Sequence, residues 1–415
     1  MRDTELYRQI LGVETPWTVT AVEVDLGAKE VRVRVEHAGK TLKCSECGRR
    51  SPGYDSHEKS WRHLDTCQLK TLLVATVPRI NCRDHGVRQV TVPWSDPGSR
   101  FTALFEALVI DWLQGATISL VAARLGLSWD QVAGIQDRAV DRGLARRKLE
   151  ASPAIGVDET SSRRGHRYVT VVSDLERPRV LWVAEGREAS ALESYYQAAG
   201  PEEVAKIACV AMDMWRPFIE ATRRAIPNAD DHIVFDKFHI AAHLGEAVDK
   251  VRRAENRSLI ADGDRTLTGT KYLWLAGAAR MTVSQRTALK SLRKKRLRTG
   301  RAWALRDEAM SLWGYESRTW AERAWRGWMA WAMRSRLEPV KKVARMIHRH
   351  WDGVINAVTT GITNAMAEGI NTKIQWIKRQ ARGFRNPDRF RRAIYFQLGG
   401  LDLYPDAMKS THSKA

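Results

Sequence analysis

Ala154-Ile155-Gly156-Val157-Asp158-Glu159 is an apolar run that ends in two acidic residues. Its length and its bounding residues are typical of a buried β-strand. The composition of the chain changes at Ala151, after a basic stretch that ends at Lys148. We therefore expect a new domain to begin at residue 151, with Asp158 at the end of its first strand.

Four more strands are predicted downstream, at residues 168–173, 180–184, 207–212 and 232–235. Helices are predicted between them at residues 188–199 and 215–226, and a third helix follows the last strand. Three strands, helix, strand, helix, strand is the order of an RNase H-like mixed sheet. In that sheet the first and fourth strands are neighbours, so Asp213, which follows the fourth strand, should lie beside Asp158.

The stretch from residue 363 to 396 contributes a third acid, Glu368, set among lysines and arginines. In a helix, Asn364, Glu368 and Asn371 fall on one face. The face to be buried carries three isoleucines, Ile370, Ile374 and Ile377. A carboxylate flanked by amides and backed by cations suits a metal ion held against a nucleic-acid phosphate. The alternative is a surface helix with ordinary charges.

Two knuckles near the N-terminus have the spacing of zinc ligands, and each is followed by glycine. The predicted ligands are Cys44, Cys47, Cys82 and His85. With all four positions filled by protein the site would be structural. The gap between the knuckles is unusually long, although it can hold strands such as residues 69–77. Cys67, His57 and His63 lie inside the gap as competing ligands, and scattered free cysteines are the alternative.

Residues 101–142 predict helices that include a helix-turn-helix. Ser128 and Gln131 form a capping box at the start of the second helix of this motif, residues 129–142. Gln131, Gln136 and Arg138 are chemically suited to base edges and phosphates. The alternative is a plain three-helix packing unit. Upstream, residues 17–24 and 30–36 alternate apolar and polar residues, as a strand pair does.

The charge of the chain points to a polyanionic partner. Lysine and arginine number 68 against 48 acidic residues, for a net charge of +20 in 415 residues. Nucleic acid is the first candidate partner, and a membrane surface is the rival. The sequence has no apolar run that could span a bilayer and no signal peptide. Five cysteines are too few for a disulfide scaffold, which favours a reducing, cytoplasmic setting.

Residues 254–350 carry no strand signal, and we expect a helical insertion there. Six of its tryptophans cluster in sequence, at positions 303, 313, 320, 325, 328 and 331. Most of these should form the core of the insertion, while an exposed one could stack on an unpaired base. The basic run at residues 293–298 is either a solvated face or a phosphate track.

Together Asp158, Asp213 and Glu368 can hold two Mg²⁺ ions through oxygen ligands. Two such metals clamp the attacking and the leaving oxygen of a phosphoryl displacement. One site could therefore cut DNA with water and then join strands with the 3′-hydroxyl released. The chain shows neither a phosphate-binding loop with Lys-Ser/Thr nor a Gly-x-Ser-x-Gly elbow that would indicate other chemistry.

The sequence resembles the DDE transposases of insertion sequences, specifically those of the ISL-three type. The resemblance rests on the two knuckles, the helix-turn-helix, Gly156-Val157-Asp158-Glu159, Asp236-Lys237-Phe238-His239, Glu368-Gly369-Ile370-Asn371 and Gly383-Phe384-Arg385-Asn386. It covers essentially the whole chain. It implies an RNase H-like catalytic core that depends on Mg²⁺, with Mn²⁺ as a possible substitute, and that acts on the terminal inverted repeats of a mobile element.

By this resemblance Asp158, Asp213 and Glu368 are the acid triad. The residues expected near the triad are Glu159, Asp236, His239, Asn364 and Asn371. Asp236 could equally be only a helix N-cap. The cations expected to contact DNA in the C-terminal stretch are Lys373, Lys378, Arg379 and Arg385. The partners implied are double-stranded DNA, as element ends and target, and further copies of the chain on paired ends.

The expected fold is therefore a multidomain α/β protein. A zinc-ribbon-like module (1–95) and a helix-turn-helix (99–150) precede the first part of the catalytic core (151–253). The helical insertion (254–350), the final helices of the core (351–402) and a flexible tail (403–415) follow. Two rival functions remain: a DNA-binding regulator that no longer cuts, and a structure-selective nuclease without strand transfer.

Overall fold

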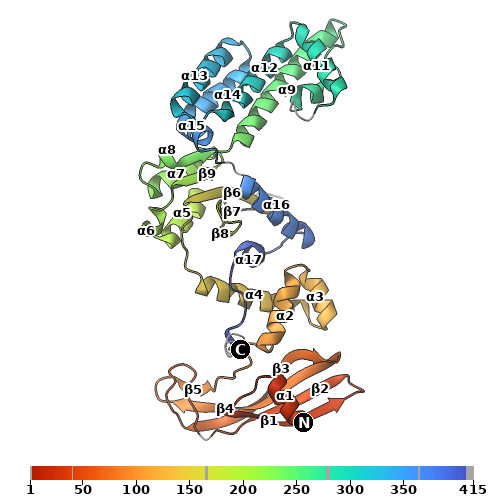
Figure 1. Ribbon diagram of the computed structural model, residues 1–415, viewed down its shortest axis with the longest axis vertical. Coiled ribbons are helices and arrows are strands. Elements are labelled where there is room, and N and C mark those ends of the chain that lie inside the picture. Colours follow the sequence, from red (N-terminus) through yellow and green to blue (C-terminus); the bar gives the residue numbers. More distant parts are fainter. Residues whose placement is uncertain (1, 40, 164–166, 277–280, 363–364, 408–415) are drawn as a thin grey trace. The chain divides into compact units, whose positions relative to one another are not determined.

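The computed structural model describes residues 2–39, 41–163, 167–276, 281–362 and 365–407. The chain divides into two compact units, which are described separately (Figure 1). Unit 1 comprises Met1–Lys148 and Tyr395–Ala415, and unit 2 comprises Leu149–Ile394. The finer division into six segments that the sequence suggests stays a prediction.

Unit 1 opens with helix α1 (Asp3–Ile10) and a five-stranded sheet in the order β1-β2-β4-β3, with β5 paired to β4. Its strands are β1 (Trp17–Asp25), β2 (Glu30–His37), β3 (Gly53–Thr66), β4 (Leu69–Cys82) and β5 (Gly86–Gln89). The antiparallel pair β1–β2 was predicted. In the core, Trp94 meets Trp17 and Trp61 edge to face, with ring centroids 4.9 and 5.5 Å away.

Three helices complete the described N-terminal part of unit 1: α2 (Ala103–Leu113), α3 (Ile118–Leu125) and α4 (Trp129–Arg146). Helix α3 ends at Gly126, whose positive φ of +63° suits a residue without a side chain. Helix α4 begins with the predicted capping box, in which the side chains of Ser128 and Gln131 each bond the other residue's backbone N–H. The helix-turn-helix is thus present as expected.

Unit 2 is built on a mixed sheet in the order β10-β9-β6-β7-β8. Its strands are β6 (Ala154–Arg163), β7 (Arg167–Asp174), β8 (Val180–Glu185), β9 (Cys209–Met212) and β10 (Ile233–Phe235). β7 is antiparallel to both β6 and β8, while β9 is parallel to both β6 and β10. The first and fourth strands are therefore neighbours, as predicted. β6, β8, β9 and β10 consequently run in one direction and point toward the same edge.

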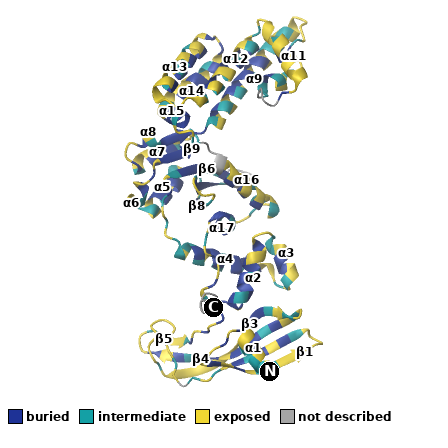
Figure 2. Ribbon diagram, viewed as in Figure 1, coloured by how far each residue is buried: buried dark blue, intermediate teal, exposed yellow. Residues whose placement is uncertain are grey.

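Helices follow the strands of this sheet: α5 (Ala189–Ala199), α6 (Pro201–Val204), α7 (Arg216–Ala225), α8 (Ala229–His232) and α9 (Lys237–Ala261). The insertion continues with α10 (Lys271–Leu275), α11 (Val283–Lys294), α12 (Arg298–Ser311), the 3-10 turn η2 (Leu312–Gly314), α13 (Arg318–Arg334), α14 (Glu338–Arg349) and α15 (Trp351–Thr360). No strand interrupts the described residues from α9 to α15, as the sequence predicts. Helix α11 is exposed along most of its length (Figure 2).

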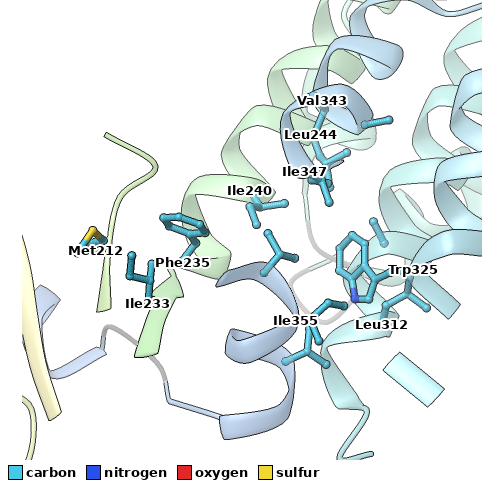
Figure 3. Packing of buried hydrophobic residues seen from close by; sticks show 14 of the residues in the cluster. Met212, Ile233, Phe235, Ile240, Leu244, Leu312, Trp325, Val343, Ile347 and Ile355 are labelled. Carbon is cyan, nitrogen blue, oxygen red and sulfur yellow. The ribbon is translucent and has the colours of Figure 1, made fainter. Parts of the chain in front are cut away.

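The core of the insertion is continuous with the core of the sheet. Phe235 of β10 and Ile240 of α9 belong to the same buried cluster as Trp325 of α13 (Figure 3). Trp303 and Trp328 are buried as well, whereas Trp320 is 58% exposed. The tryptophan cluster is therefore mostly core, as expected.

Two helices close the chain, α16 (Ala365–Gln380) and α17 (Pro387–Leu398). The predicted apolar face of α16 is buried through Ile370, Ile374 and Ile377. Asn386 caps α17 by accepting a hydrogen bond from the backbone N–H of Asp388 at 2.8 Å. Within the described residues, we find no helix that has both the length and the apolar character needed to span a lipid bilayer.

We expect Gly353→Ala to destabilise unit 2, because a Cβ at Gly353 would lie 2.4 Å from ring atoms of Phe235. Such overpacking costs about 1–3 kcal/mol. Gly327→Ala is the matched control: this helical glycine has nothing within 4 Å of the added Cβ, and the change should be neutral or stabilising by up to about 1 kcal/mol. Thermal unfolding of both variants measures the difference, and equal midpoints would contradict it.

Candidate functional site

The carboxyl-terminal edge of the sheet in unit 2 gathers the acidic residues. Val157 of β6 pairs with Met212 of β9 in the parallel register. The next residue on each chain is an aspartate, Asp158 and Asp213. Asp236 directly follows β10, the strand parallel to β9. The neighbouring position of Asp158 and Asp213 was predicted from strand order. The predicted strand end was wrong, because β6 continues past Asp158 to Arg163 and pairs Asp158 with Val171 of β7.

The electrostatics of this edge reflect crowded negative charge. Burial raises the pKa of Asp158 to about 6, and the charge of Asp213 adds to the rise, while hydrogen bonds from the Glu159 backbone and the Asn371 side chain oppose it. Burial also raises the pKa of Glu159, with Asp213 contributing. Adjacent carboxylates that resist ionisation in this way are suited to a divalent cation, which would stabilise their charged forms.

His239, in the first turn of α9, lies against these acids. Its Nε2 is 2.8 Å from Oδ1 of Asp213 and 4.0 Å from Oδ2 of Asp236. The hydrogen bond to Asp213 raises the pKa of His239. Asp236 is buried and caps α9 by accepting from the backbone N–H of Phe238 at 2.9 Å. It is thus an N-cap, the simpler of the two roles considered for it, and it also lies near the imidazole.

Helix α16 is attached to β6 by a row of polar side chains. Asn371 donates to Oδ2 of Asp158. Gln375 Nε2 donates to Oγ1 of Thr160 at 2.9 Å, and Lys378 Nζ donates to the carbonyl oxygen of Ser161 at 2.6 Å. Their spacing of four and three residues puts them on one face of the helix. This row, Asn371, Gln375 and Lys378, fixes the register of α16 along β6.

Glycine allows the close approach of α16. A Cβ at Gly156 would lie 3.2 Å from Cβ of Ala367, in addition to contacts of 2.9 Å with Leu175 and Ser173. Glu368 is therefore the residue after a direct contact with β6, and one helical turn before Asn371. Its side chain is exposed. Asn364 lies outside the described residues.

The three predicted acids do not form a closed ligand set. In the part of the chain that the structure describes, only the N-terminal Cys/His cluster brings three or more candidate ligand atoms within 4.8 Å of one another. Asn371, rather than Glu368, contacts Asp158. The structure thus brings Asp158, Asp213, His239 and Asn371 together, while Glu368 lies one helical turn from Asn371 with its side chain exposed.

Sequence reasoning missed Arg187 at this edge. Arg187 follows β8, and its guanidinium lies over the rings of Tyr168 and Trp215, 4.4 and 5.1 Å from their centroids. Its Nη1 is 3.6 Å from Oε1 of Glu159. The signal was available: in the predicted sheet the third strand runs parallel to the first, so the residue after it belongs to the same edge as Asp158.

The expectation for Gln136 requires correction. Gln136 is only 7% exposed and lies on the buried face of α4, so it does not present its amide to a DNA groove. Arg138 is held in an ion pair with the buried Glu106, with Nη2 at 2.5 Å from Oε1. Gln131 is exposed, although its amide oxygen is used in the capping box.

A second correction concerns Lys378, whose ammonium bonds to Ser161 in β6 and does not project outward. The packing of α16 against the strand is the physical reason. Lys373, Arg379 and Arg385 are exposed and remain suited to phosphates.

The predicted zinc ligands converge in unit 1. Cys44, Cys47, Cys82 and His85 have their ligand atoms within 4.8 Å of one another. The hydrogen bond from His85 lowers the pKa of Cys82 to about 6, toward the thiolate that binds metal. Gly48 and Gly86 have φ of +69° and +65°, which explains the glycine after each knuckle.

The three competing ligands lie elsewhere. Cys67 is exposed, His57 lies 3.4 Å from Asp55, and the buried His63 bonds Thr102 at 2.9 Å. The donor set of three thiolates and one imidazole therefore fits a closed structural zinc site.

Comparison with known proteins agrees with this organisation. Residues 155–394 match the ISL3 family described as transposase, residues 90–140 match the helix-turn-helix domain of transposase family ISL3, and residues 40–85 match the zinc finger of the IS204/IS1001/IS1096/IS1165 transposases. The chain is 29% identical, over 96% of each chain, to the transposase for insertion sequence element IS1557 of Mycobacterium tuberculosis. It is 25% identical to the transposase for IS1001 of Bordetella parapertussis, over 87% of this chain and 90% of that protein.

We expect Cys47→Ser to lose bound zinc and to lower the unfolding temperature of the zinc-binding part, because the site needs four ligands. Cys67→Ser is the matched control, since Cys67 lies outside the cluster. Metal analysis of protein purified in the presence of zinc should give about one ion per chain for the wild type and the control. Equal zinc content in both variants would refute the ligand assignment.

Proposed function

Since the chain belongs to the ISL3 family of transposases, we propose that it binds the terminal inverted repeats of an insertion sequence, cuts the DNA there and joins the cut strand to target DNA. The observation that carries this proposal is the parallel pairing of β6 with β9, which sets Asp158 beside Asp213. The strand order and directions of the sheet favour an RNase H-like catalytic core.

Asp158, Asp213 and Glu368 are the residues we assign to two Mg²⁺ ions, with Mn²⁺ as a substitute. The raised pKa of Asp158 supports a cation at this edge. Bound Mg²⁺ supplies Lewis-acid activation of the phosphate and of the attacking oxygen. Glu368 is exposed and lies one helical turn before Asn371, which bonds Asp158, and we assign it as the third carboxylate of the set.

The reaction has two displacements at phosphorus. In cleavage, an oxygen–phosphorus bond forms to water and the bond to the 3′-oxygen breaks, which leaves a 3′-hydroxyl and a 5′-phosphate. In strand transfer, that 3′-oxygen bonds a target phosphorus while the bond from this phosphorus to the target's own 3′-oxygen breaks, which releases a target 3′-hydroxyl. His239 accepts or returns a proton near Asp213, as its 2.8 Å contact allows.

The zinc-binding part and the helix-turn-helix serve to hold the DNA end. The exposed Lys373, Arg379 and Arg385 bind backbone phosphates near the site. Two or more copies of the chain assemble on paired ends, which measurement of the mass of the protein–DNA complex tests. A regulator without cleavage is the second candidate, favoured by the exposure of Glu368 and by the lack of a three-carboxylate cluster among the described residues.

We expect Asp158→Asn and Glu368→Gln each to lower the cleavage rate by at least about 100-fold, because each removes a metal-binding carboxylate. The assay incubates a labelled end of the protein's own element with Mg²⁺ and resolves nicked and joined products. Asp231→Asn is the control, since this exposed residue precedes the opposite end of β10. Binding of the DNA by the wild type without any cutting would favour the regulator.

We expect Lys378→Met to lower cleavage roughly tenfold without changing the salt dependence of DNA binding, because Lys378 positions α16 on β6. Arg379→Gln, at an exposed position, should instead reduce the slope of log K against log salt by about 1. Binding titrations at several salt concentrations separate the two. A reduced slope for Lys378→Met would identify it as a phosphate contact after all.

A further inference from the structure

We propose that Arg187 binds a backbone phosphate of the DNA strand held at the acidic edge of the sheet. This inference rests on the proposed function and deepens it, because it names the residue that holds the polyanion next to the carboxylates. It arises from the placement of Arg187, from the rings that hold it and from the charges around it.

The backbone at Arg187 is fixed on both sides. Gly186 turns the chain after β8 with a φ of +88°. Its N–H donates to the carbonyl oxygen of Tyr168 at 2.8 Å. On the other side, Nε1 of Trp215 donates to the carbonyl oxygen of Arg187 at 3.0 Å. The side chain therefore starts from a defined position at the edge where β6 and β9 carry their aspartates.

The guanidinium is held by two aromatic rings at once. Its central carbon lies 4.4 Å from the ring centroid of Tyr168 and 5.1 Å from that of Trp215. Contact with two rings limits the rotamers of a long side chain and keeps its guanidinium in place. An ion pair with Glu159 does not require aromatic contacts to the guanidinium. The two rings therefore indicate that the orientation of Arg187 serves a further ligand.

The hydrogen-bonding capacity of Arg187 is largely unused within the described residues. Its one ion pair there is with Glu159, at 3.6 Å, whereas a guanidinium has five N–H donors. The side chain of Arg187 is 36% exposed and Trp215 is 37% exposed, so a ligand can reach the fork. An oriented fork that is open to solvent fits the two oxygens of a phosphate.

The surrounding charges explain why a phosphate needs this residue. Asp158, Glu159, Asp213 and Asp236 all lie at the same edge and repel a DNA backbone. His239, whose imidazole can also carry a positive charge, is already hydrogen-bonded to Asp213. Arg187 supplies a fixed positive charge at this edge, and it stays protonated at any physiological pH.

The competing interpretation is that Arg187 only neutralises Glu159. The two roles differ in what Glu159→Gln does. If Arg187 only neutralises Glu159, then Arg187→Gln should not weaken DNA binding in a protein that already carries Glu159→Gln. If phosphate binding is the role, Arg187→Gln weakens DNA binding whether or not Glu159 is charged.

The test measures binding of a labelled element end by the full-length chain in Mg²⁺ at several salt concentrations. Every protein carries Glu368→Gln, so that DNA is held without being cut. We expect Arg187→Gln to weaken binding roughly tenfold and to reduce the salt slope by about 1, as loss of one phosphate contact does. The same losses should appear when Arg187→Gln is combined with Glu159→Gln.

Three further variants test the aromatic support and the specificity of the effect. Trp215→Phe should retain binding, and Trp215→Leu should lose part of it, because only the first keeps a ring beside the guanidinium. Arg224→Gln is the matched control: Arg224 lies at the other end of α7 and is paired with Glu193 at 2.5 Å. Its binding and salt slope should equal those of the background protein, and thermal unfolding monitors the fold of each variant.

An unchanged salt slope for Arg187→Gln, or losses that vanish in the double variant with Glu159→Gln, would overturn the assignment of Arg187. Failure of the proposed function looks different. In that case the protein without Glu368→Gln does not cut the element end, or the Glu368→Gln background still cuts it.

Discussion

The parallel pairing of β6 with β9 is the constraint on which the site depends. It places Val157 opposite Met212, so the next residue of each strand brings a carboxylate to the same edge. Burial and mutual repulsion raise the pKa of Asp158 to about 6. A sheet gains no stability from such a pair, because two neighbouring carboxylates disfavour each other's charge. The pair therefore does not contribute to folding stability, and it agrees with the cation site proposed above.

Helix α16, which carries Glu368 and Asn371, lies far from β6 in the sequence. Asn371 and Asp158 are 213 residues apart, and a flexible loop of that length would hold α16 only loosely. The insertion is instead folded, and its buried cluster runs without a break into the sheet through Phe235 (Figure 3). Asn356 of α15 reinforces this junction by donating to the carbonyl oxygens of Asp230 and Ile233, at 2.8 and 3.0 Å. The insertion thus returns the chain toward β6 from a folded support that is packed against the sheet.

Sequence patterns predicted the features that depend on local spacing or strand order: the zinc ligands, the capping box, the isoleucine face of α16 and the neighbouring aspartates. They failed where the packing partner of a helix decides which face is buried. Gln136 was judged by its chemistry, although it lies four residues after the buried Val132 and shares its face. Lys378 shares a face with Asn371, but only the docking of α16 on β6 reveals that this face points inward.

The net charge of the chain and the charge of the acidic edge have opposite signs. With a net charge of +20, the chain as a whole attracts nucleic acid, yet the edge that holds Asp158 and Asp213 repels it. Long-range attraction brings DNA to the protein but cannot hold a phosphate against carboxylates at short range. Holding a phosphate there requires positive charge at the acidic edge. The proposed metal ions are one source of this charge, and a side chain that the fold orients is the other.

Arg187 is the oriented side chain. It contacts the rings of Tyr168 from β7 and of Trp215 from the start of α7, while Arg187 itself lies in the loop after β8. The same strand ends that concentrate the negative charge therefore also provide the support for the cation that opposes it.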